Sequence, residues 1–224
     1  MKTRLCFKKV ISLMVAILTL GLCIIGCQNL ERPEGGPLLT TDQIEFYEKL
    51  YGKQMEQVLR ALGISQEDLS DPGHKPGAYD NTSVEGYYQL PETVEYNGVE
   101  FCQILHFALG NHHPDVKPGA FLEIQFLACQ LSSEETAELV ELLFQDARAL
   151  YGEPESYPPN SIQNEGRLDQ VAAGEAWCSD DWYVNGNETV VSISGNASEF
   201  DDGYGHVCVA YVDGDLEHSE KTQP

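Results

Sequence analysis

The stretch that decides the fold is residues 94–107, VEYNGVEFCQILHF. Apolar residues flank the dipeptide Asn97-Gly98, and this pair tolerates the positive φ angles that a tight type I′ turn requires. The pattern therefore predicts a β-hairpin. The same arrangement returns in residues 182–193, WYVNGNETVVSI, around a second Asn-Gly pair, and it predicts a second hairpin.

Helical periodicity predicts two long amphipathic helices outside the hairpins. In the first, apolar residues recur at helical spacing from Ile44 to Leu62, after a capping residue at Thr40. The second begins at Ser132 and keeps an apolar stripe as far as Leu150. Glycines follow both helices, as is typical of helix ends.

The two halves of the chain repeat the same order of elements. The tripeptide at 60–62, Arg-Ala-Leu, returns at 148–150, and the Asn-Gly pairs share this offset of 88 residues. A further apolar strand follows each hairpin, at 121–127 and 207–212. We therefore expect an α+β fold in which two long helices pack on antiparallel sheet. A tandem helix-loop-three-strand repeat over 40–131 and 132–213 would explain the order, and one mixed sheet with two unrelated helices is the alternative.

This order of elements resembles the fold of the β-lactamase inhibitory protein and of the small lipoproteins of outer-membrane assembly. The resemblance covers about residues 40–213 and rests on element order, not on a diagnostic motif. Proteins of those families bind other proteins through a sheet face and hold no catalytic site. The resemblance therefore implies a binding protein, and it transfers no residue role.

The N-terminus resembles a bacterial lipoprotein signal peptide. Four basic residues precede an apolar run from Val10 to Ile25, which Gly26 and Cys27 follow. The run is shorter than the roughly 20 residues that span a bilayer, so an uncleaved membrane helix is the weaker interpretation. We expect residues 1–26 to be the signal peptide, Cys27 the lipidated first residue, and 27–39 a tether. The protein would then lie on the extracytoplasmic face of a cell membrane.

Charge narrows the range of partners. The chain has 13 basic and 36 acidic residues, a formal charge of −23, and removal of the signal peptide leaves nine basic residues and a charge of −27. Such a chain does not suit a phosphate backbone, so nucleic acid is excluded as a partner. Anionic lipid headgroups repel it as well, so the membrane would be reached through the lipid anchor alone.

Motifs of catalysis and cofactor binding are absent from the sequence. There is no Gly-x-Ser-x-Gly elbow and no glycine-rich phosphate loop, so no catalytic residue and no cofactor is predicted. An enzyme would need a cleft that unites distant residues such as Glu175, Asp181 and His206. A calcium site is a further alternative, because Asp213, Asp215 and Glu217 alternate after the last strand. The acidic tail at 214–224 is more simply explained as a solvated end.

Two further groups of residues have a structural and a functional interpretation. Trp177, Trp182 and Tyr183 lie near acidic residues, as in sugar-binding surfaces, but strand packing is the simpler explanation. Cys102 and Cys129 lie on consecutive predicted strands and would form a disulfide if they faced each other. The alternative is that they are buried free thiols.

These observations favour a membrane-anchored extracytoplasmic lipoprotein that acts as a protein- or ligand-binding module. Sheet and helices offer surfaces, whereas no nucleophile, base and orienting group have the spacing that catalysis requires. The alternatives are an extracytoplasmic enzyme with an unrecognised site and a calcium-binding lipoprotein. A protein or glycan partner that is neutral or basic is favoured by the charge.

Overall fold

The computed structural model describes residues 38–70, 86–109, 116–154, 159–186, 188–197 and 204–214. By its contacts the chain divides into two units, 1–31 and 32–224, and all the described residues belong to the second. The predicted signal peptide and Cys27 lie outside the described residues, as does nearly all of the predicted tether.

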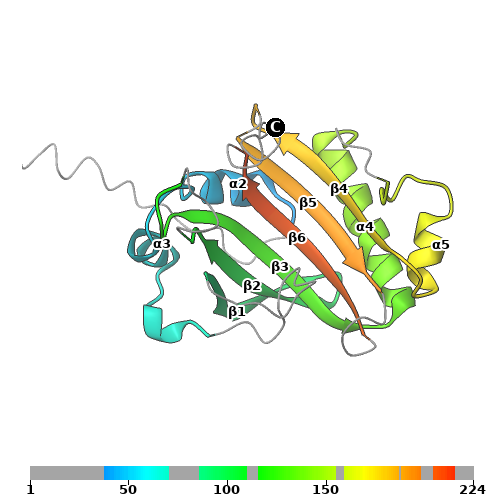
Figure 1. The fold of residues 1–224 in the computed structure, drawn as a ribbon, viewed down its shortest axis with the longest axis horizontal. Helices are drawn as coiled ribbons and strands as arrows, with labels where there is room; N and C mark the ends of the chain where they lie inside the picture. The colour runs from blue at the N-terminus through cyan, green and yellow to red at the C-terminus, as the bar shows by residue number, and fades with distance from the viewer. Residues whose placement is uncertain are drawn as a thin grey trace, which may run out of the picture. The chain divides into compact units, whose positions relative to one another are not determined.

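The described residues form an α+β fold around one six-stranded antiparallel sheet (Figure 1). The strands lie in the order β1-β2-β3-β6-β5-β4, so β3 and β6 pair at the centre of the sheet. Their bounds are β1 Tyr87–Tyr96, β2 Val99–Phe107, β3 Phe121–Leu131, β4 Trp177–Val184, β5 Thr189–Asn196 and β6 Gly205–Asp213.

Both predicted hairpins are confirmed. Tyr96 pairs with Val99 across the first turn, and Val184 pairs with Thr189 across the second. The asparagine and glycine of each turn have positive φ angles, 50° and 80° in the first and 51° and 74° in the second. These are the angles of a type I′ turn, which explains why an Asn-Gly pair marks each hairpin.

Four α-helices and one 3₁₀ helix complete the described fold: α2 Thr41–Glu48, α3 Met55–Leu62, η1 Gln66–Asp68, α4 Ser133–Tyr151 and α5 Arg167–Ala172. The longest, α4, contacts β3, β4, β5 and β6, and in the view of Figure 1 it is seen behind and beside β4. The Ser132 side chain accepts a hydrogen bond from the Glu135 backbone, and the Glu135 carboxylate accepts one from the Ser132 backbone. This capping box begins the helix at the predicted residue, Ser132.

The prediction of one long helix from Ile44 to Leu62 is wrong. The segment forms two helices, α2 and α3, joined by residues 49–54, and Gly52 has a left-handed φ of 71°. The Gly52 backbone N–H donates to the Phe121 carbonyl, and the Phe121 N–H donates to the Lys53 carbonyl. Pairing with the first residues of β3 therefore interrupts the helical hydrogen bonds, and a continuous helix would lose it.

Alternation along the strands separates a helix-covered side of the sheet from the opposite side. Val207, Val209 and Tyr211 on β6 are fully buried. Of the two residues between them, Cys208 is half-buried and Ala210 is buried. Tyr211 packs against Phe126 of β3 and against Tyr47 of α2. The hydrophobic core therefore lies between the sheet and the helices.

Two glycines allow α4 to approach the sheet closely. A Cβ atom on Gly195 of β5 would lie 2.3 Å from Val140 Cγ2, and one on Gly205 of β6 would lie 2.0 Å from Thr136 Oγ1. Both distances are shorter than real contacts allow, so only glycine fits at these positions. On α4, Val140, Leu143 and Ala147 are buried as predicted, whereas Leu150 is 51% exposed and does not belong to the apolar stripe.

Candidate functional site

The side of the sheet opposite α2 and α4 is the candidate functional site, and we call it the open face. Gly195 and Gly205 face α4, so the neighbouring residues of each strand point the other way. Register places their side chains in rows across all six strands, and no described helix has contacts that place it over them. Three rows define the open face: Tyr87, His106, Glu123, Val212, Val190 and Tyr183; Gln89, Ile104, Gln125, Ala210, Ser192 and Asp181; Thr93, Cys102, Leu127, Cys208, Ser194 and Ser179.

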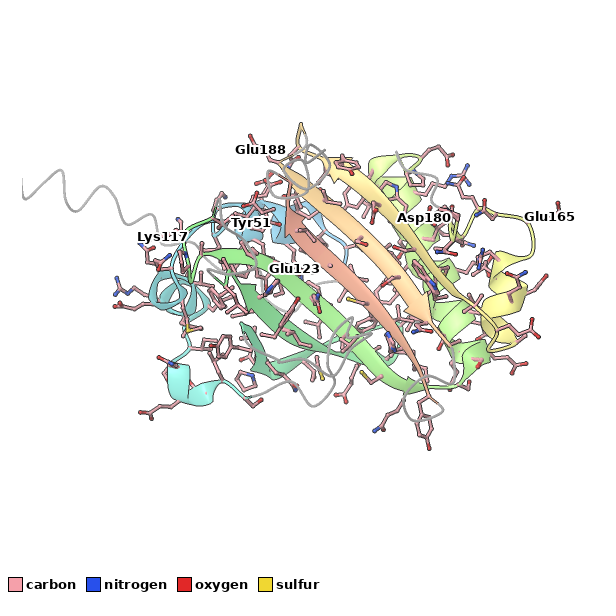
Figure 2. The ribbon with its side chains drawn as sticks, viewed as in Figure 1. Tyr51, Lys117, Glu123, Glu165, Asp180 and Glu188 are labelled. Carbon is pink, nitrogen blue, oxygen red and sulfur yellow. The ribbon has the colours of Figure 1, made fainter. Side chains whose placement is uncertain are left out.

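A polar cluster occupies the β1–β3 part of the open face. His106 Nδ1 lies 3.3 Å from Glu123 Oε2, and both side chains are only 13% exposed. Gln125 Nε2 donates to Glu123 Oε1 at 2.8 Å, so each carboxylate oxygen has one neighbour. The ring of Tyr87 stacks on that of His106, with 4.0 Å between centroids and 7° between planes. Figure 2 labels Glu123 on β3, within the sheet.

The surroundings of Tyr87 keep its hydroxyl protonated. Burial raises the pKa of Tyr87 well above its usual value, and the nearby Glu123 and Cys208 raise it further. A protonated phenol can donate a hydrogen bond, but it cannot serve as a base near neutral pH. The cluster therefore offers a histidine and a carboxylate that can accept hydrogen bonds, next to an aromatic ring.

Three of the four described cysteines lie on this side of the sheet. All four are free thiols, and Cys178 alone is fully buried, on the side that faces α4. Leu127, not Cys129, lies opposite Cys102 in the β2–β3 register. The expected cross-strand placement of Cys102 and Cys129 is therefore not observed. Burial raises the pKa of Cys178 to about 11, and burial also raises that of Cys208, so neither thiol ionises readily.

A fourth row, of aromatic and polar residues, lies at the other end of the open face. Trp177 on β4 pairs with Asn196, which pairs with His206 of β6. Trp177 is 39% exposed, and Tyr204, two residues before His206, is 54% exposed. Aromatic side chains of this kind supply much of the binding energy in protein interfaces.

Of the aromatic residues proposed as a sugar-binding group, Trp182 belongs to the core, as the packing interpretation predicts. It is fully buried, packs on Phe144 of α4, and donates from Nε1 to the Gly152 carbonyl at 2.9 Å. Tyr183 and Trp177 lie on the open face because they alternate with it. The structure therefore divides this group between the two sides of the sheet.

Asp180 has a structural role on the helix-covered side. Its carboxylate accepts from Ser161 Oγ at 2.7 Å and from the Ile162 backbone N–H at 2.8 Å, so it holds the segment before α5 against β4. Burial raises the pKa of Asp180, while these two hydrogen bonds oppose the rise. Figure 2 labels Asp180 on β4.

The residues suggested for an enzyme are not brought together. Asp181 lies opposite Ser192, which lies opposite Ala210 of β6. His206 is therefore four residues along β6 from the row that contains Asp181, and β5 separates the two strands. Glu175 precedes β4 and lies on none of the strands.

The suggested calcium ligands can be placed only in part. Asp213 is the last residue of β6, and Asp215 and Glu217 lie outside the described residues. Within the described ranges, no three His, Cys, Asp or Glu side chains are grouped so that they could hold a metal ion.

Basic residues are missing from the sheet. None of the six strands contains a lysine or an arginine, whereas acidic residues occur on five of them: β1, β2, β3, β4 and β6. The six described basic residues lie on helices or in the segments that connect elements: Lys49, Lys53, Arg60, Lys117, Arg148 and Arg167. The charges on the open face are therefore negative, apart from any charge that its histidines carry.

Sequence reasoning missed the cluster of Tyr87, His106, Glu123 and Gln125. The only available signal was that a histidine and a glutamate interrupt apolar strands. Their pairing depends on the β2–β3 register, which contains an irregularity between His106 and Phe107. Alternation alone could not supply that register.

In comparisons with known proteins, no family model, no curated protein and no solved structure matches the chain. No helix in the described part of the chain is both long and apolar enough to span a membrane.

Proposed function

We propose that this protein is a lipoprotein, anchored at Cys27 on the extracytoplasmic face of a cell membrane, that binds another protein through its open face. The observation that carries the proposal is the sheet itself. One side is sealed by α2 and α4, whereas no described helix lies over the other. On that side Tyr87 and Ser194 are half-buried and Trp177 is exposed, whereas Ile104, Leu127, Val190 and Ala210 are buried between them. Partly exposed polar and aromatic residues are what a binding surface needs.

The aromatic and polar ends of the open face support a protein partner. Trp177 provides an exposed ring at one end, and the His106–Glu123 pair provides oriented polar groups at the other. Aromatic anchors with a few fixed polar groups are typical of interfaces between proteins. An enzyme has less support, because the described residues suggested for catalysis lie on separate rows and strands.

The basic start, the apolar run and Gly26-Cys27 support the anchor. A single acyl chain binds a membrane only weakly, so stable anchoring takes more than one chain. The charge of −23 gives no electrostatic help at an anionic surface. Membrane attachment would therefore depend on lipidation of Cys27.

We also propose that the fold is a tandem repeat of the kind found in the β-lactamase inhibitory protein. Exchanging β1, β2 and β3 for β4, β5 and β6 reverses the strand order onto itself, which is consistent with two equivalent halves. Two long helices are not part of this proposal. In the order of elements, the two short helices α2 and α3 precede β1, β2 and β3, whereas the single long helix α4 is the first helix before β4, β5 and β6. The offset of 88 residues holds for the Asn-Gly turns and falls to 84 at the first residues of β3 and β6.

Replacing the anchoring cysteine tests the location. Cys27→Ala should leave an uncleaved precursor or move the protein out of the membrane fraction, as measured by fractionation and by the mass of the product. Cys23→Ala is the matched control and should be processed normally, because Leu22, not a small residue, precedes Cys23. A Cys27→Ala protein that is processed and retained like the original would disprove the anchor.

Site-specific photo-cross-linking in intact cells tests the binding surface. A photoreactive residue at Ser194, near the centre of the open face, should give a discrete protein adduct. The same residue at Glu138, exposed on α4, is the matched control and should give none. Absence of a Ser194 adduct, or equal adducts from both positions, would contradict binding through the open face.

A further inference from the structure

We infer that the partner presents a lysine- or arginine-rich protein surface to the open face, with at least one basic side chain directed at the cluster around Glu123. This inference rests on the proposed binding function and specifies the chemistry of its partner. Four observations support it: the missing basic residues, the pairing of Glu123, the net charge, and the extent of the face.

The first observation is that the strands supply negative charges without any lysine or arginine. Glu95, Glu100, Glu123 and Asp181 all lie on the open side by register. Described basic residues, by contrast, are used elsewhere: Arg60 pairs with Glu56 on α3, and Arg148 pairs with Glu153 after α4. A surface with one sign of charge attracts a partner of the other sign and repels the rest.

The second observation concerns Glu123, whose carboxylate is largely removed from water. Its carboxylate lies within hydrogen-bond distance of the neutral amide of Gln125 and of the imidazole of His106. Neither carries the permanent charge of a lysine or an arginine. A carboxylate that is held in place and desolvated gains most from a cationic donor, because the interaction is stronger where water is excluded. Glu123 is therefore fixed in position to receive such a donor.

The third observation is the net charge, which argues against two other occupants. Two copies of the processed chain would bring together two acidic faces, each on a molecule of charge −27. An anionic lipid surface would meet the same repulsion. A basic protein surface is the occupant that the charge favours.

The fourth observation is that the face is large enough for a stable interface. Glu123 and Trp177 are separated by three strand steps and by six residues along the strand direction. With spacings of about 4.8 Å and 3.3 Å, this diagonal is roughly 25 Å long. Interfaces of standard size bury about 800 Å² on each partner. The rectangle around this diagonal is smaller than that, but the whole face of six strands, about 24 Å wide and at least about 26 Å long at the same spacings, approaches this size. The cationic contact and the aromatic contact would lie at its two ends.

Charge-matched variants of the full-length lipidated protein, kept in an uncharged detergent, test the inference. The probe is an octalysine peptide, and its dissociation constant is measured by fluorescence anisotropy. Glu100→Gln with Glu123→Gln should weaken binding roughly tenfold. Glu138→Gln with Glu141→Gln removes the same charge from exposed positions on α4 and should change it by less than about twofold. Circular dichroism checks that both variants remain folded.

Equal weakening by the two double variants would mean that the peptide senses only net charge, and it would overturn the inference. The Ser194 adduct provides the second, independent measurement. Mass spectrometry of the cross-linked segment should identify a sequence rich in lysine and arginine. An acidic segment or a glycan at Ser194 would overturn the basic-partner inference, and a protein adduct of any charge would leave the binding function standing. Absence of any adduct would instead count against the binding function itself.

Discussion

The two sides of the sheet are built from the same strands, yet they differ in almost every property. On β6, Val207, Val209 and Tyr211 face the helices and are fully buried, whereas His206, Cys208 and Val212 face the other way and are half-buried. The helix-covered side has close contacts and few polar groups. The open face has histidines, thiols, serines and carboxylates. We therefore expect the helix-covered side to contribute most of the stability of the fold, whereas the open face provides the polar and ionisable groups.

The largest difference between the two sides is expected at the tryptophans of β4. Trp182→Ala should lower the free energy of unfolding by about 3–5 kcal/mol, because it removes a buried ring and its hydrogen bond to Gly152. Trp177→Ala, on the open face, should cost less than about 1 kcal/mol. Denaturant unfolding measures both. Similar losses from the two variants would mean that the open face is packed as tightly as the core.

The second largest difference in stability between the two sides is expected at two neighbouring small residues of β5. Gly195→Ala places a Cβ against Val140 of α4 and should cost about 1–3 kcal/mol through overpacking. Ser194→Ala, one residue along and on the open face, should change the stability by less than about 0.5 kcal/mol. Thermal unfolding compares them directly. A neutral Gly195→Ala would show that α4 can shift away from the sheet at little cost.

Asp180 makes the stability of the helix-covered side depend on pH. Its pKa is raised in the folded protein, so the carboxyl group contributes stability below its unfolded pKa and loses that contribution as pH rises through the folded value. Relative to Asp180→Asn, the unmodified protein should therefore become less stable as pH rises from the acidic range.

Unfolding curves of both proteins between pH 3.5 and pH 7 measure this effect, and Glu138→Gln on the exposed side of α4 is the control. A stability difference between Asp180→Asn and the unmodified protein that stays constant over this range would contradict the raised pKa of Asp180.

The smallest effect is expected where the covered side meets solvent. The Tyr96 hydroxyl at the end of β1 donates to Asp146 of α4 at 2.6 Å, and burial together with Asp146 raises its pKa. Tyr96→Phe should cost about 0.5–1.5 kcal/mol, because it removes this bond and leaves the ring in place. Denaturant unfolding of the variant and the unmodified protein measures this loss. A neutral Tyr96→Phe would mean that water replaces the tyrosine hydroxyl fully.

Local signals in the sequence were enough to predict the hairpins and the start of α4. An Asn-Gly pair determines its own turn, and Ser132 with Glu135 forms a capping box without help from the rest of the chain. The α+β class follows from the same signals. Predictions that depend only on neighbouring residues were the reliable ones.

Predictions that depended on distant contacts failed. The apolar periodicity from Ile44 to Leu62 predicted one helix. Residues 52–54 instead pair with the beginning of β3, almost 70 residues away in the sequence, and this pairing interrupts the helix. The short helix α5 was missed because its six residues have no strong stripe. The cluster around Glu123 depends on the register between β2 and β3, and the alternation of polar and apolar residues along each strand does not determine that register.

The edges of the sheet bear on how this protein avoids aggregation. Lysines on edge strands commonly prevent sheets from joining edge to edge, and here β1 and β4 have none. Other contacts occupy their backbones. Ser70 pairs with Gln89 beside an irregular part of β1 that contains Pro91, and the Ser179 N–H of β4 donates to the Asn160 carbonyl. Detachment of the segment around Asn160 would therefore expose the backbone of a strand that contains no lysine, and a second molecule could add a strand to the sheet there.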